Sequence, residues 1–274
     1  MPTTLSIIGF GSMGSAILRG AVEAGVLEAE SVLVIEPDDG RREQARRLGC
    51  VVSAEARFAW DSPHVLLAVK PQVFASVAEQ MGPAPAASDG VIVTSIMAGL
   101  SSAAIRQVLG GNTRIIRAMP NTPCRVKAGM TALAIGEGAR SGDEHFPVML
   151  FASMGRVVKV EEHLLHAVTA VSGSGPAYVF LLAESMEQAG IQAGLDHHTA
   201  RTLAYQTILG AGRMLTADGD GSHAPVSADA LRTQVTSPGG TTAAALEVFF
   251  EAEFPQIVAE AILAARDRAV ELGR

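Results

Sequence analysis

The chain lacks lysine over its second half and has no excess of basic residues anywhere. Its three lysines, Lys70, Lys127 and Lys159, all lie before residue 160, and 28 acidic residues outnumber 21 basic ones, for a formal net charge of −7. A protein that binds a nucleic-acid backbone needs a basic excess to displace counterions from the phosphates. We therefore expect no nucleic-acid partner.

Long apolar runs and metal-ligand spacings are also missing. No stretch approaches the roughly 20 apolar residues of a membrane-spanning helix, and the start MPTTLSIIGF has no basic segment before an apolar run broken at Gly9 and Gly11. Cys50 and Cys124 have neither metal-site spacing nor the pattern of a disulfide framework. No His, Asp, Glu and Cys set stands at ligand spacing. We expect no membrane partner, no export signal, no metal and a reducing, cytoplasmic location.

Apolar residues make up 48% of the chain and charged residues 18%, which is typical of a globular protein. Up to about residue 160, short β-rich runs alternate with helical patterns, which predicts an α/β fold with a mainly parallel sheet. The expected strands are Leu5–Gly9, Ser31–Glu36, Val65–Val69, Val91–Ile96, Arg114–Ala118, Met130–Ile135 and Arg156–Val160.

After Glu161 the β-branched runs stop, and Ala, Leu and Met recur at helical spacing. The expected helices are His163–Val171, Pro176–Ala189, Thr199–Leu215, Ala228–Gln234, Thr241–Phe250 and Pro255–Leu272. The segment Thr216–Val226 is rich in Gly, Asp and Pro and is predicted to be an exposed loop. We therefore place a domain boundary between residues 162 and 163, with domains over 1–162 and 163–274.

A glycine-rich turn follows the first expected strand and opens a helix near Ser12. It consists of Gly9, Phe10, Gly11, Ser12, Met13 and Gly14. In the GxGxxG pattern the glycines allow a tight turn, a close approach of a pyrophosphate and close packing of helix on strand. The free amides and the helix dipole then hold the phosphates. Such turns also occur in ordinary α/β loops, but the preceding strand and a carboxylate 22 residues further on favour a dinucleotide site.

That carboxylate is Glu36, at the end of the second expected strand. It can accept a hydrogen bond from the adenosine ribose 2′-OH, and it would repel a 2′-phosphate. Arg41 and Arg42 follow and could instead pair with such a phosphate. All three could also be solvated charges at a helix start. The pattern favours NADH and leaves NADPH open.

Two further strand ends are expected to meet the cofactor, because ligands lie beyond the carboxyl ends of parallel strands. Their residues are Ala68, Val69 and Lys70 at one end, and Met119, Pro120 and Asn121 at the other. Lys70 and Asn121 could equally be plain turn residues.

Two sequence motifs in the helical half, referred to below as phrases, each precede an expected helix. Ser172–Tyr178 (SGSGPAY) has a proline near the first turn, and Thr236–Thr242 (TSPGGTT) offers consecutive free amides with hydroxyl groups, which suit a carboxylate. Helix capping by Ser237 or Thr241 is the simpler reading of the second phrase. The two phrases together, in a chain with a dinucleotide site, favour a substrate site.

Taken together, these motifs make the sequence closely resemble the pyrroline-5-carboxylate reductase family. The motifs that carry the resemblance are GFGSMG, LAVKP (Leu67–Pro71), RAMPNTP (Arg117–Pro123), AVTAVSGSGPAY (Ala167–Tyr178) and LRTQVTSPGGTTAAAL (Leu231–Leu246). The resemblance implies an N-terminal Rossmann-type, doubly wound domain and a C-terminal, all-helical dimerisation domain. It also implies reduction of the imine of 1-pyrroline-5-carboxylate to L-proline by NADPH or NADH, the last step of proline biosynthesis. It further implies a homodimer at least, with rings such as decamers.

The same resemblance implies the site residues. The substrate is expected at the amides and hydroxyls of Ser237, Gly239, Gly240, Thr241 and Thr242, and the cofactor at the residues named above. Two features depart from the family. Glu36 stands where relatives that favour NADPH often have a small hydroxyl residue, and the segment 216–226 is longer than usual.

Reduction of a cyclic imine needs an oriented imine carbon and a donor near the nitrogen, and Thr242 is the expected donor. The β-hydroxyacid dehydrogenases share the N-terminal turn but use a lysine of the second domain, and this chain has none there. A redox sensor that binds the dinucleotide without catalysis is the non-enzyme alternative. The intact SPGGTT phrase favours the enzyme.

Overall fold

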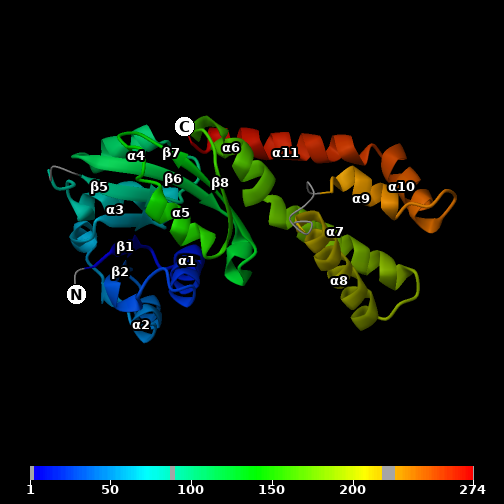
Figure 1. Ribbon diagram of the computed structural model, residues 1–274, viewed down its shortest axis with the longest axis horizontal. Helices are drawn as coiled ribbons and strands as arrows, with labels where there is room; N and C mark the ends of the chain where they lie inside the picture. Colours follow the sequence, from blue (N-terminus) through cyan, green and yellow to red (C-terminus); the bar gives the residue numbers. More distant parts are fainter. Residues whose placement is uncertain (1–2, 87–89, 218–225, 274) are drawn as a thin grey trace. The chain divides into compact units, whose positions relative to one another are not determined.

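The computed structural model describes residues 3–86, 90–217 and 226–273, and its first part holds an eight-stranded sheet (Figure 1). The strands are β1 (Leu5–Ile8), β2 (Val32–Ile35), β3 (Val51–Ser53), β4 (His64–Leu67), β5 (Val91–Ser95), β6 (Thr113–Pro120), β7 (Gly129–Ile135) and β8 (Gly155–Lys159). Their order is β3-β2-β1-β4-β5-β6-β7-β8. All neighbouring strands are parallel except β6 and β7. The predicted α/β class with a mainly parallel sheet is confirmed.

Helices cover both faces of the sheet because its strands bury side chains on both sides. In β2, Val32 and Val34 pack into one apolar cluster with α1 (Ser12–Glu23), α2 (Asp39–Arg47) and α5 (His145–Ala152). Leu33 and Ile35 of the same strand pack into the other, with the 3₁₀ segment η2 (Ala56–Asp61), α3 (Phe74–Met81) and α4 (Ser102–Leu109). This doubly wound core fixes the carboxyl edge of the sheet, where β1, β4, β5 and β6 all end.

All seven predicted strands are present, with ends within two residues of those expected. The strand β3 was not predicted. It has only three residues, it lies at the edge of the sheet, and its first residue, Val51, is 49% exposed. A strand this short and this exposed leaves too weak an alternation in the sequence to be recognised.

The second part of the chain is helical. Its elements are η5 (Glu162–Leu164), α6 (Leu165–Val168), the π-helical turn η6 (Thr169–Gly173), α7 (Gly175–Gln192), α8 (His197–Thr216), α9 (Ala228–Gln234), α10 (Thr241–Glu251) and α11 (Phe254–Glu271). Five of the six predicted helices are α-helices close to the predicted bounds. The sixth, predicted over 163–171, is helical throughout but changes type, because a 3₁₀ turn opens this stretch and a π-helical turn closes it.

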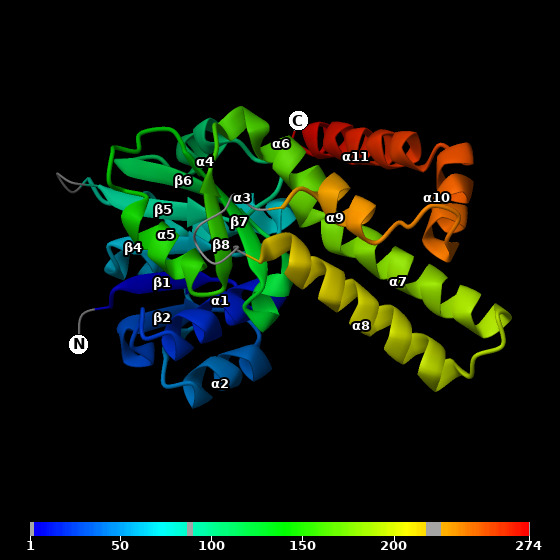
Figure 2. The ribbon, with the colours of Figure 1, turned by 45° about the vertical axis from the view of Figure 1, so that its right-hand side comes forward.

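The helices α7 and α8 form an antiparallel pair (Figure 2). They approach closely at Gly190, where an added Cβ would lie 3.2 Å from the Cβ of Ala200. The predicted loop 216–226 lies mostly outside the described residues.

The chain divides into two compact units. One comprises Met1–Ser174 with Leu263–Arg274, and the other comprises Gly175–Ile262. The predicted domain boundary at residues 162 and 163 falls before this division and stays a prediction. The expectation that no stretch approaches the length and composition of a membrane span was wrong. The helical stretch Glu162–Gln192 is long and apolar enough to cross a membrane by length and composition alone, and little of its most apolar window is buried.

Candidate functional site

The glycine-rich turn joins β1 to α1 at the carboxyl edge of the sheet. Gly9 has φ +93°, and a Cβ there would lie 2.7 Å from the carbonyl oxygen of Ala68, so the turn requires glycine. At Gly11 an added Cβ would meet no atom within 4 Å, which leaves the space over this residue open. Gly11 is also the N-cap of α1, and no side chain caps the helix. The first amides of α1 are thus free to bind an anion.

Glu36 lies directly beyond β2 and is only 4% exposed. Its Oε2 accepts a hydrogen bond from the Phe10 amide at 2.7 Å, and its Oε1 accepts one from the Asp38 amide at 3.2 Å. The nearest guanidinium is that of Arg41, with Nη1 3.7 Å from Oε2. The carboxylate therefore fixes the glycine-rich turn to the end of β2 and keeps a negative charge there. Arg42 instead donates to the carbonyl oxygens of Glu36 and Pro37.

The two predicted strand ends both lie at this edge. The Ala68 amide donates to the Ile8 carbonyl at 2.8 Å, so the end of β4 lies beside the glycine-rich turn. Val69 is half-buried and Lys70 is exposed. Lys70 has no ion-pair partner within the described ranges. At the end of β6, Pro120 is buried and Met119 is half-buried.

Asn121 has a different environment from the one expected. Its Nδ2 donates to the Ser172 carbonyl at 3.0 Å, and its Oδ1 accepts from the Met130 amide at 2.9 Å. The side chain is therefore committed to joining the end of β6 to β7 and to the π-helical turn η6. The carboxamide keeps a second N–H and a second oxygen lone pair beyond these two bonds, so the predicted contact of Asn121 with the cofactor stays a prediction. Met119 packs at the same junction, since a Cβ on Gly173 would lie 2.8 Å from its Cε.

The sequence reasoning missed a third strand end, that of β5. The residues after it, Ile96–Leu100, lie between the ends of β4 and β6 because β5 lies between those strands. The Ile96 amide donates to the Leu67 carbonyl at 3.1 Å, and the Met97 amide donates to the Ser95 hydroxyl at 3.2 Å. The rule applied to the other two strand ends applies here as well, because Val91–Ile96 was already recognised as a strand.

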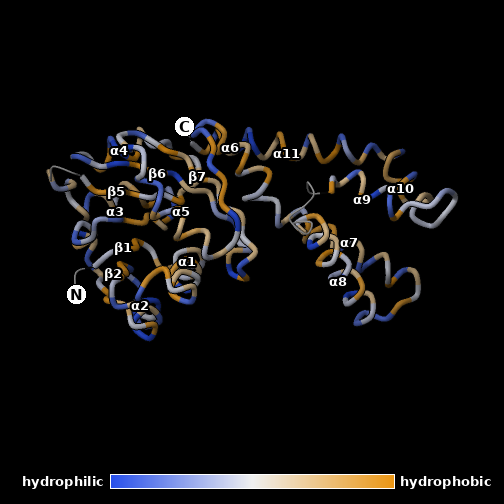
Figure 3. The backbone as a smooth tube through the Cα atoms, viewed as in Figure 1, coloured by the Kyte–Doolittle hydropathy of each residue, from blue (hydrophilic) through white to orange (hydrophobic). Residues whose placement is uncertain are grey.

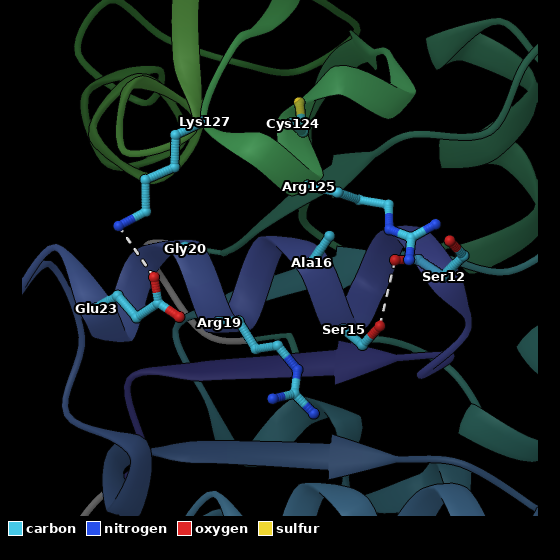
Figure 4. Close-up of a pocket in the computed structure, with 9 residues that line it drawn as sticks. All are labelled: Ser12, Ser15, Ala16, Arg19, Gly20, Glu23, Cys124, Arg125 and Lys127. Carbon is cyan, nitrogen blue, oxygen red and sulfur yellow. Dashed lines mark hydrogen bonds and ion pairs between the residues drawn. The ribbon is translucent and has the colours of Figure 1, made fainter. Parts of the chain in front are cut away.

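A pocket of about 300 Å³ lies along α1 and the short helical segment η4 (Thr122–Val126) (Figure 4). Ser12 and Arg125 line one end, and Glu23 and Lys127 form an ion pair of 2.9 Å at the other. Cys124 also contributes to the lining, and burial raises the pKa of its thiol, so it is a poor nucleophile. The pocket thus adds positive charge beside the glycine-rich turn.

The phrase SPGGTT opens α10 in the other compact unit. Gly239 has φ +69°, the Gly240 amide donates to the Ser237 carbonyl at 3.0 Å, and Gly240 is the N-cap of the helix. No side chain caps α10, so the capping role considered for Ser237 or Thr241 is absent. Thr241 is exposed and Thr242 is half-buried in the first turn. This N-terminus resembles that of α1 in having a glycine turn and free amides.

A second pocket, of about 760 Å³, lies beside this phrase. Gly239 and Gly240 line it, together with Arg232, Thr236 and Glu247 from α9, α10 and the segment between them. The Arg232 guanidinium also lies over the Phe250 ring, 5.7 Å from its centroid. The SPGGTT motif therefore borders an open pocket within its own unit, and the residues that line this pocket include the charged Arg232 and Glu247.

Comparison with known proteins gives two family models. The model described as pyrroline-5-carboxylate reductase dimerisation matches residues 162–272, and the model described as NADP oxidoreductase coenzyme F420-dependent matches residues 4–99. The first match runs from η5 to just beyond the end of α11, and the second covers the strands β1 to β5. The second match includes the glycine-rich turn before α1, and the first includes the SPGGTT motif before α10.

Relatives and solved structures match over the whole chain. The chain is 38% identical to a pyrroline-5-carboxylate reductase of Synechocystis, with all of both chains covered, and 37% identical to one of Haemophilus influenzae, with 98% and 97% covered. A solved structure of a Coxiella burnetii pyrroline-5-carboxylate reductase has a TM-score of 0.88 at 32% identity, with all of both chains covered. A Plasmodium falciparum pyrroline carboxylate reductase with NADP bound has a TM-score of 0.84 at 28% identity, with 99% and 98% covered.

Proposed function

Because the chain belongs to the pyrroline-5-carboxylate reductase family, we propose that it reduces 1-pyrroline-5-carboxylate to L-proline with NADPH or NADH. The cofactor supplies a hydride to the imine carbon, and a proton goes to the ring nitrogen, giving the secondary amine of proline and the oxidised dinucleotide. Residues 1–162 then form the dinucleotide-binding domain, and residues 163–274 the substrate-binding and dimerisation domain.

The observation that carries this proposal is that α1 and α10 each combine an uncapped N-terminus with a preceding glycine turn. Both α1 and α10 follow a glycine turn, and neither has a side chain hydrogen-bonded to its first amides. Free helix N-termini bind anions, and this reaction has two: the pyrophosphate of the dinucleotide and the carboxylate of the substrate. The open space over Gly11 fits the pyrophosphate. The SPGGTT phrase fits a small carboxylate.

The roles of the remaining residues follow from these anchors. Amides of Gly239 and Thr241 hold the substrate carboxylate, the Gly240 amide keeps its bond to the Ser237 carbonyl and closes the turn, and the Ser237 hydroxyl lines that turn. Thr242, one residue into the helix, presents its hydroxyl to the ring nitrogen. The Glu36 carboxylate accepts from the adenosine ribose, and the ends of β4 and β6 contact the rest of the dinucleotide through Ala68–Lys70 and Met119–Asn121.

A second copy of the chain is the proposed partner of the helical unit, as a homodimer from which larger rings such as decamers can form. Apolar side chains stay exposed on α7, α8, α10 and α11, among them Phe180 at 66%, Leu181 at 64% and Val248 at 64%. Figure 3 shows hydrophobic residues along α7 and α8. A dimer interface explains the apolar stretch 162–192 without a membrane. The two buried, free cysteines fit the reducing cytoplasm.

The test is direct. Purified protein is mixed with NADH or NADPH and 1-pyrroline-5-carboxylate, and both cofactor oxidation and proline formation are measured. We expect stoichiometric proline with either cofactor. Cofactor binding without turnover would instead support a redox sensor, and turnover only with a β-hydroxy acid and the oxidised cofactor would support the dehydrogenase alternative.

A further inference from the structure

The segment that follows β5 is held at both ends by a charged cluster, formed by the buried Arg117 and the half-buried Glu162. Arg117 of β6 is 5% exposed, and its Nη2 donates to the Met97 carbonyl at 3.1 Å. Its Nη1 lies 3.6 Å from Oε1 of Glu162. That same Oε1 accepts from the Ser102 amide at 2.6 Å, and Oε2 accepts from the Ser102 hydroxyl at 2.5 Å. The Arg117–Glu162 ion pair is thus hydrogen-bonded to Met97, near the start of the segment, and to Ser102, the first residue of α4.

The segment is also held in its middle. Gly99 has φ +87°, and a Cβ there would lie 3.0 Å from the Leu272 carbonyl oxygen and 3.2 Å from the Gly273 nitrogen. The C-terminal end of α11 therefore packs on its backbone. Glu162 lies on the 3₁₀ turn η5, and Leu272 lies directly after α11. Both residues belong to the same compact unit as the segment 96–102.

A contribution to stability alone does not explain why the charged pair of Arg117 and Glu162 is found here. Burying a guanidinium costs free energy that an ion pair rarely returns in full, and Arg117 Nε has no partner in the described parts of the chain. Burial lowers the Arg117 pKa, and the nearby Glu162 acts in the opposite direction. An apolar residue of similar size would fill the same space without that cost. The position of the segment gives another reason for the cluster.

In this strand order a bound dinucleotide would lie across the point where the order reverses, between β1 and β4. With its adenosine ribose at Glu36, beyond β2, its nicotinamide half would extend toward β4 and β5. The segment 96–102 follows β5 on that side. Its backbone is therefore placed to support the nicotinamide and not the adenosine.

We propose that Arg117 and Glu162 are positioning residues, which act through the segment 96–102 to hold the nicotinamide half of the cofactor in the geometry for hydride transfer. They contact neither cofactor nor substrate directly. The inference rests on the proposed reductase function for its kinetic readout only. Dinucleotide binding tests it independently of turnover.

Two variants change the cluster in different ways. Glu162→Gln keeps the shape and an oxygen acceptor for Ser102 but removes the charge that faces Arg117. Arg117→Met keeps most of the apolar volume and removes the bond to the Met97 carbonyl. Glu137→Gln is the matched control, because it removes only the 3.1 Å side-chain ion pair with Arg106 of the same α4 helix. It keeps the Glu137 amide, which donates to the Ser102 hydroxyl at 2.9 Å.

Both cluster variants should reduce kcat about tenfold, and the primary isotope effect with 4-deuterated NADH should rise because hydride transfer becomes more rate-limiting. NADH affinity should fall severalfold, whereas affinity for ADP-ribose, which lacks the nicotinamide, should stay as in wild type. Glu137→Gln should match wild type throughout. A purely structural role would instead lower NADH and ADP-ribose affinity together, along with Tm.

That parallel loss would overturn the proposal, as would wild-type kcat in both cluster variants. If Arg117→Met fails to fold, Glu162→Gln alone decides between the outcomes, since it is isosteric. If the wild-type protein shows no imine reduction, the proposed function fails. The contrast between NADH and ADP-ribose binding still tests the positioning role in that case.

Discussion

At the scale of single residues, Thr241 and Thr242 at the start of α10 are predicted to have different roles in the reaction. Thr242→Ala should lower kcat about 10²-fold, the lower end of what a positioned proton donor contributes, because the imine nitrogen can arrive already protonated. Substrate KM should change little, since the backbone amides remain. The measurement is kcat and KM for 1-pyrroline-5-carboxylate at saturating NADH.

Thr241→Ala is the control for that experiment. Thr241 is exposed and contributes its amide, which the substitution keeps. Both variants should bind NADH as wild type does, because neither residue belongs to the glycine-rich turn. Loss of kcat in Thr241→Ala with normal kcat in Thr242→Ala would mean that the donor is the other threonine.

Glu36 gives a second prediction at this scale, on the preference between NADH and NADPH. NADH should be used at least as well as NADPH, because the buried carboxylate repels a 2′-phosphate. Glu36→Gln removes that charge and keeps an oxygen for the Phe10 amide, so the ratio of kcat/KM for NADPH over NADH should rise about tenfold, equivalent to about 1.4 kcal/mol. Glu36→Ser loses the Phe10 bond as well and should weaken both cofactors. A wild-type preference for NADPH above about tenfold would show that Arg41 dominates.

Residue roles could be read from the sequence where the spacing is local. Glu36 was identifiable because it follows the glycine-rich turn by a fixed interval at a strand end. The bond of Asn121 to Ser172 joins residues 51 positions apart and depends on a π-helical turn, which leaves no periodic signal. The Arg117–Glu162 pair joins a strand to a 3₁₀ turn, and no spacing in the sequence indicates that the two residues are in contact.

At the scale of elements, long periodic segments were predictable and their irregular joins were not. The helix α9 has the predicted bounds, whereas the stretch 163–171 breaks into three helical types. The strands were predictable because β1 and β2 are buried throughout and so appear as short apolar runs. The end of β5 was missed as a site for a different reason: no distinctive side chain marks it, and the segment contributes backbone.

The junction of β6, β7 and the π-helical turn gives a prediction at this scale. Asn121→Asp keeps the acceptor for the Met130 amide but puts an oxygen where Nδ2 met the Ser172 carbonyl. We expect the free energy of unfolding in urea to fall by about 1–3 kcal/mol, the cost of a buried group left unsatisfied. Ser172→Ala keeps the carbonyl and should cost about 0.5 kcal/mol or less. Equal stability of Asn121→Asp and wild type would mean that the bond contributes nothing to the junction.

At the scale of the whole molecule, the two compact units differ in how much apolar surface they bury. In the first, almost every strand residue of β1, β2 and β5 is buried. In the second, large apolar side chains on every long helix stay exposed, including Leu203 at 54% and Phe250 at 51%. Exposed apolar surface on this scale marks an interface in a soluble protein.

The protein should therefore be an oligomer, at least a dimer, at micromolar concentration, as measured by light scattering coupled to size exclusion. Replacing the two most exposed large apolar side chains of α7 in Phe180→Glu/Leu181→Glu should give monomers or aggregates with greatly reduced activity, because charges cannot be buried unpaired at an apolar interface. Met149→Glu is the matched control: Met149 is 53% exposed, but it lies on α5 of the other unit, so this variant should stay oligomeric and active. A stable, fully active monomer of the wild-type chain would contradict the prediction, because the apolar faces of the helical unit would then need no partner.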